Sequence, residues 1–77
     1  MDIFEILKGA IERILEYEKD FREEEKIKKD LFNAGASHGI WVALSTIRND
    51  LLVFEQDEVL EKIGLSKEVE ELFKINN

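Results

Sequence analysis

Apolar residues recur every three or four positions through the first part of the chain, which is the spacing of one face of an α-helix. When residues are placed 100° apart, a narrow arc with spacings of 4, 3, 4, 3 and 4 collects Ile3, Leu7, Ala10, Ile14, Tyr17 and Phe21. A second apolar arc lies about 100° away and holds Phe4, Ile11 and Leu15. The pattern predicts a helix that is apolar over a broad face and contacts two neighbours.

The segment that follows is almost entirely charged. Between residues 16 and 30 the only uncharged side chains are Tyr17, Phe21 and Ile27. Glu and Lys residues three or four positions apart support a solvated helix. Asp2 is a good N-cap, and no helix breaker precedes residues 33–35. We therefore expect one long helix over residues 2–33.

A second amphipathic helix is predicted over residues 37–54, with Ser37 as its cap. Its clearest apolar face consists of Ile40, Leu44, Ile47, Leu51 and Phe54. Trp41 and Leu52 lie roughly 110° from the centre of that face, beside Arg48. This helix has more apolar surface than one antiparallel partner covers.

Two short helices are expected at the end of the chain, over residues 57–63 and 66–75. Gly64 suits the residue after a helix, where a left-handed conformation is common, and Ser66 suits an N-cap. These elements predict an all-α fold, an antiparallel helical hairpin with two short C-terminal helices, in a single domain. The hairpin leaves residues 3–15 uncovered, and residues 57–73 are available to cover them.

Small residues gather where the two long helices are expected to meet. Gly35, Gly39 and Ala43 are spaced by four, so on a helix they share one face and allow two backbones to approach closely. We expect a tight corner at residues 33–35 and a helix–helix seam beyond it. Apolar surface left over on either long helix predicts self-association, with a homodimer as the expected form.

The charge balance limits the partners. The net charge is −7 and the isoelectric point about 4.7, which disfavours nucleic acid and anionic membrane surfaces and suits a protein with a basic face. The acidic N-terminus has no signal-peptide pattern, and no apolar run approaches the ~20 residues that span a bilayer. The absence of cysteine fits a cytoplasmic protein.

The chain offers little to a catalytic, cofactor or metal site. His38 is the only histidine, and Ser37 beside it points about 100° away on a helix, so the two do not form a nucleophile–base pair. Residues 59–73 have the outline of a helix-turn-helix, but Leu60 and Glu70 stand where that motif has a small and an apolar residue. We expect no enzyme activity, cofactor, metal or DNA binding.

The remaining interpretation is a small, non-enzymatic accessory protein that binds proteins. Trp41, Arg48 and Leu52 are the candidate interface, because aromatic and arginine residues dominate binding energy, and the small-residue seam would hold the corner. Trp41 is either exposed for binding or covered by the two short helices. The alternative is an acidic inhibitor, decoy or immunity-type protein whose residues 16–30 engage a basic protein surface.

Overall fold

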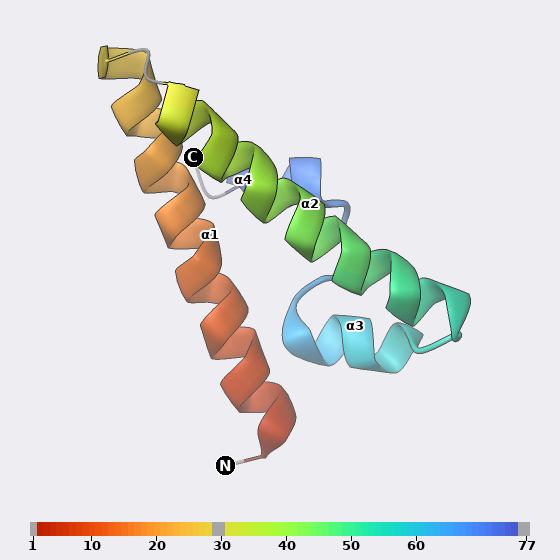
Figure 1. Ribbon diagram of the computed structural model, residues 1–77. Helices are drawn as coiled ribbons and strands as arrows, with labels where there is room; N and C mark the ends of the chain where they lie inside the picture. Colours follow the sequence, from red (N-terminus) through yellow and green to blue (C-terminus); the bar gives the residue numbers. More distant parts are fainter. Residues whose placement is uncertain (1, 29–30, 76–77) are drawn as a thin grey trace.

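The computed structural model describes residues 2–28 and 31–75, and in these residues it contains four helices and no strand (Figure 1). The two long helices are α1 (Ile3–Lys28) and α2 (Leu31–Val53). The two short ones are α3 (Asp57–Ile63) and α4 (Val69–Ile75). The predicted all-α fold, with a long hairpin and two short C-terminal helices, is confirmed.

The boundary between the long helices differs from the prediction. The expected corner at residues 33–35 is wrong, because α2 begins at Leu31 and runs through Asn33, Gly35 and Ser37. Asn33 is buried inside α2 instead of ending α1. The ring of Phe32 meets that of Phe21 edge to face, with 6.2 Å between centroids. Burial of Asn33 and the ring contact of Phe32 favour a helical conformation through this segment. Residues 29 and 30, expected inside the first helix, lie outside the described residues.

Local chemistry sets the other helix ends. The Asp2 carboxylate accepts a hydrogen bond from the Glu5 backbone N–H at 2.9 Å, so Asp2 caps α1 as expected. Gly64 follows α3 with a φ of 83°, and the N–H of Leu65 donates to the Leu60 carbonyl at 2.8 Å, which closes the helix end.

The last helix begins later than predicted, at Val69 rather than residue 66. Arg48 of α2 donates to the carbonyl oxygens of Leu65 (3.2 Å) and Ser66 (3.4 Å). Leu65 is fully buried. The segment before α4 therefore stays outside the helix because its buried side chain and its carbonyl groups are both held by other elements.

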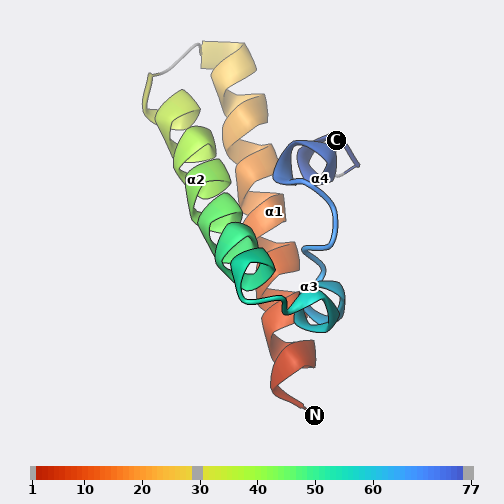
Figure 2. The ribbon, with the colours of Figure 1, turned by 90° about the vertical axis from the view of Figure 1, so that its right-hand side faces the viewer.

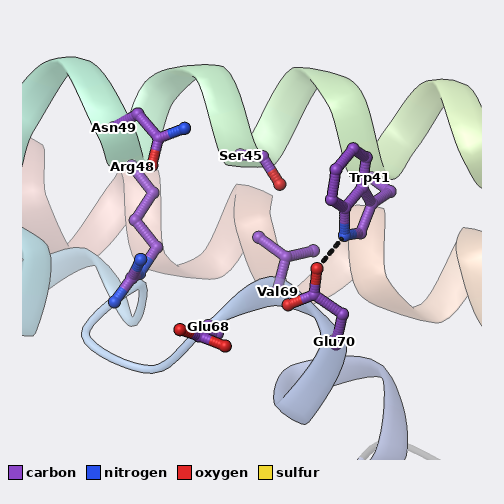
Figure 3. Close-up of a pocket in the computed structure, with 7 residues that line it drawn as sticks. All are labelled: Trp41, Ser45, Arg48, Asn49, Glu68, Val69 and Glu70. Atoms are coloured by element: carbon purple, nitrogen blue, oxygen red, sulfur yellow. Dashed lines mark hydrogen bonds between the residues drawn. The ribbon is translucent and has the colours of Figure 1, made fainter.

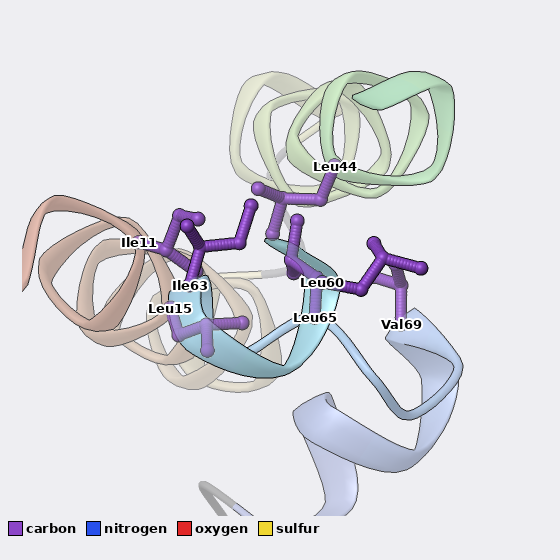
Figure 4. Packing of buried hydrophobic residues seen from close by; sticks show 7 residues of the cluster. All are labelled: Ile11, Leu15, Leu44, Leu60, Ile63, Leu65 and Val69. Carbon is purple, nitrogen blue, oxygen red and sulfur yellow. The ribbon is translucent and has the colours of Figure 1, made fainter. Parts of the chain in front are cut away.

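The buried core lies between the long helices and the C-terminal segment (Figure 4). It comprises seven residues: Ile11, Leu15, Leu44, Leu60, Ile63, Leu65 and Val69. The contribution of α1 is Ile11 and Leu15, with Phe4 packed at the edge, which is the second apolar arc of the sequence. Of the longer stripe that begins at Ile3, Ile14 packs against this core, whereas Ile3, Leu7 and Tyr17 are exposed.

The helices form two uneven layers. Both α3 and α4 lie on the same side of the α1–α2 pair, the right-hand side in Figure 2, and no described element covers the other side. The resulting molecule is elongated, with extents of 40 × 27 × 18 Å and a radius of gyration of 13.2 Å. A compact chain of this length has a radius of gyration of about 11.5 Å.

Candidate interaction surfaces

An apolar groove runs between α1 and α2 on the side that α3 and α4 leave uncovered. Its volume is about 690 Å³, within the range of binding pockets. We call it the open groove and define it by its lining: Ile14, Tyr17, Phe21, Ala36, Gly39, Ile40, Ala43, Leu44 and Ile47. Apart from the Tyr17 phenol, the side chains of this lining are apolar, so the groove offers a partner an apolar surface.

No ionisable group except the Tyr17 phenol lines the open groove. In the part of α2 that lines the groove, residues 31–49, the ionisable side chains are His38 and Arg48. Both line pockets on the α4 side of α2 instead. A charged ligand would therefore find no counter-charge in the open groove, whereas an apolar surface would fit it.

Large side chains at the groove are strongly exposed. Tyr17 is 58% exposed and Ile47 44%, and Ile3, which continues the same stripe of α1, is 60% exposed. Soluble monomers rarely expose a contiguous apolar patch of more than a few hundred Å². The stripe with heptad-like spacing is thus the surface that the chain itself leaves uncovered.

The predicted small-residue seam does not hold the hairpin together. A Cβ atom placed on Gly35 or Gly39 would meet nothing within 4 Å. Gly39 and Ala43 line the open groove, and Gly35 lies inside α2 rather than at a corner. The small residues leave open space above α2, and no other helix among the described residues fills it.

Trp41 faces the other side of α2, toward α4 (Figure 3). Its indole N–H donates to a carboxylate oxygen of Glu70 at 2.7 Å, and the His38 ring stacks on it with 5.8 Å between centroids. Trp41 is half-buried and packs against the core. Of the two alternatives for Trp41, the structure favours coverage by the C-terminal segment.

The predicted trio of Trp41, Arg48 and Leu52 does not form one open patch. Trp41 and Arg48 line a pocket of about 210 Å³ together with the start of α4, and Leu52 is not part of that lining. The Arg48 guanidinium already donates to two backbone carbonyls of the chain. The role of these residues in binding a partner stays a prediction, with less free surface than the sequence suggests.

A buried carboxylate in α1 escaped the sequence interpretation. Glu18 is fully buried, and Arg22 pairs with it at 2.8 Å while also donating to the Phe73 carbonyl of α4 at 3.1 Å. Burial raises the pKa of Glu18, against the opposing effects of the Arg22 charge and the Ser37 hydroxyl. The available signal was its position: Glu18 follows Ile14 by four residues and Leu15 by three.

Because the folded chain raises the pKa of Glu18, it holds this proton more tightly than the unfolded chain does. The stability from this group is present at acidic pH and is lost as pH rises through the folded pKa. We therefore expect Glu18→Gln, which replaces the buried carboxylate by a neutral amide of the same shape, to raise the free energy of unfolding at neutral pH, with the gain shrinking as pH falls. Urea titrations across the acidic range measure it.

The matched control is Glu16→Gln, since Glu16 is exposed on the same helix. It should leave the free energy of unfolding unchanged. A stability loss in Glu18→Gln at neutral pH that disappears as the pH falls would mean that the pairing of the ionised carboxylate with Arg22 outweighs its burial.

Other site chemistry is sparse in the described part of the chain. Residues 2–28 and 31–75 contain no group of three or more His, Asp or Glu side chains placed to hold a metal ion. His38 is exposed apart from its stacking on Trp41. The same residues include no helix with both the length and the apolar character of a membrane span.

Comparisons with protein families, curated proteins and solved structures found no match to this chain.

Proposed function

We propose that this chain is a non-enzymatic protein–protein interaction module that self-associates through the open groove. The observation that carries the proposal is an uncovered apolar face that combines the exposed stripe of α1 with the uncharged side of α2. We place the module in the cytoplasm, because a chain without cysteine does not depend on an oxidising compartment for disulfide bonds.

The exposed area supports a second copy as the occupant. The chain has 5544 Å² of accessible surface, whereas a compact monomer of its mass has about 4,850 Å². The excess is about 700 Å², close to the ~800 Å² that each partner buries in a standard interface. Pairing two such faces would give each chain the burial that it lacks.

The placement of charge favours a second copy over a basic partner at the open groove. The chain carries a net charge of −7, and exposed acids such as Glu16, Asp20 and Glu23 lie on α1. A basic partner would be drawn to these acids and not to a groove lined by apolar side chains. A second copy brings the matching apolar face, so the apolar contact favours association while the net charges oppose it.

This opposition makes the salt dependence diagnostic. Adding salt shortens the Debye length from about 30 Å at 0.01 M to about 8 Å at 0.15 M, which weakens repulsion between the acidic chains and leaves the apolar contact intact. We expect the dimer fraction to rise with salt in light scattering at fixed protein concentration. A dimer that dissociates as salt is added would instead be held by ion pairs, contrary to the proposal.

A further inference from the structure

We infer that two copies pair about a two-fold axis along the bisector of α1 and α2, so that each α1 packs on the partner's α2 and Tyr17 fills the space over the partner's Gly39. This inference rests on the proposed self-association and specifies its geometry. Three independent features of the described chain lead to it: the splay of the long helices, the sizes of the side chains on each, and their relative heights.

The splay of the helices favours this axis. From the end where Lys28 and Leu31 lie near each other, α1 and α2 diverge toward Ile3 and Val53 (Figure 1). Rotation about the bisector places α1 over the partner's α2 along its whole length, with opposite chain direction. Rotation about the axis that lies in the same plane but perpendicular to the bisector would place each helix over its own copy, and the two copies would cross at an angle. Antiparallel neighbours along their full length are the arrangement of a four-helix bundle.

Side-chain size distinguishes the two helices. The α1 side of the open groove presents the large residues Ile14, Tyr17 and Phe21. The small residues of the lining, Ala36, Gly39 and Ala43, all come from α2, where they stand beside Ile40, Leu44 and Ile47. Facing α1 with the partner's α1 would oppose large side chains to one another and leave a void over Gly39. Facing α1 with the partner's α2 lets large residues enter the space over small ones, as close packing requires.

The relative heights bring Tyr17 to Gly39. The Phe21–Phe32 ring contact fixes the level of the two helices near one end. Tyr17 lies four residues before Phe21, or about 6 Å along α1, and Ala36 lies four residues after Phe32 on the antiparallel α2. Helical side chains lean toward the N-terminus, which carries the Tyr17 ring toward Gly39. Rotation about the bisector leaves the position of each residue along that axis unchanged. The Gly39 of the second copy therefore lies opposite Tyr17 of the first.

The test exchanges the large and small residues. Tyr17→Ala should raise the dimer dissociation constant about 100-fold, because an aromatic anchor is lost twice per dimer. Gly39→Phe should weaken the dimer similarly, because the ring occupies the space that Tyr17 needs. Within the monomer an added Cβ meets nothing within 4 Å, and circular dichroism checks that the full ring also leaves the fold intact. Tyr17→Ala with Gly39→Phe should bind more tightly than either single variant.

Sedimentation equilibrium of the four proteins decides the inference. Recovery in the double variant supports the pairing of Tyr17 with the partner's Gly39. A double variant as weak as the two single effects combined, in a wild-type chain that does dimerise, overturns this geometry and leaves the proposed self-association standing. A wild-type chain that stays monomeric overturns both.

Discussion

Ile47→Glu is expected to make the chain monomeric at concentrations where the wild-type chain is a dimer. Ile47 lines the open groove and is 44% exposed, so pairing would bury the new carboxylate without a counter-charge. Burial of an unpaired charge costs several kcal/mol, and the substitution occurs twice per dimer. An effect of about 3 kcal/mol raises the dissociation constant more than about 100-fold, which sedimentation velocity resolves.

The matched control is Leu52→Glu on the same helix. Leu52 is 41% exposed, which is close to the 44% of Ile47. Unlike Ile47, Leu52 does not line the open groove. It should leave the dimer intact, while both variants keep their helix content because glutamate is a good helix former. Dissociation by Leu52→Glu and not by Ile47→Glu would move the interface to the face that holds Trp41.

Leu65→Ala is expected to cost about 3 kcal/mol of the free energy of unfolding. Leu65 is a fully buried member of the core and belongs to the segment that leads to α4. A domain of 77 residues has roughly 8 kcal/mol of stability in all, so the loss is a large share. Urea unfolding followed by circular dichroism and Trp41 fluorescence measures it, since α4 contacts that indole.

Two comparisons make this result specific. Leu52→Ala, at an exposed leucine of α2, should cost less than about 1 kcal/mol. The Leu65→Ala loss should also persist in the Ile47→Glu background, because Leu65 lies in the core and the open groove lies on the other side of the long helices. A loss no larger than that of Leu52→Ala would show that the C-terminal segment adds little to the fold.

The parts of the fold that follow from the sequence are those set by neighbouring residues. Asp2 caps α1 through a hydrogen bond to Glu5, and Gly64 ends α3 in the left-handed conformation. Both depend on side-chain or backbone chemistry within a few positions. The turn between the long helices was misplaced because Gly35 is compatible with either a helix end or a helix interior, and the decision depends on contacts such as that of Phe32 with Phe21.

Which apolar arc of α1 becomes buried could not be read from α1 itself. Both arcs have helical spacing, and the more regular one, which contains Tyr17, is the one left open. Burial of Ile11 and Leu15 depends on where α3 and α4 dock. That docking is set by distant residues, including the Arg48 hydrogen bonds to the segment before α4. The same long-range contacts explain why Trp41 is partly covered.

The buried acid was missed for a compositional reason. Glu18 belongs to a charged run in which nearly every side chain was expected to face solvent. Only its helical position, between the two apolar arcs, separates it from exposed neighbours such as Glu16. Composition describes such a segment well on average, whereas the burial of one member depends on its angle around the helix.

The mass of the wild-type chain in solution tests the central claim most directly. Light scattering across a dilution series at physiological salt should give twice the 9.0 kDa chain mass at the concentrated end and approach the chain mass on dilution. A mass of one chain throughout, with the open groove exposed to solvent, would contradict the claim that a second copy covers it.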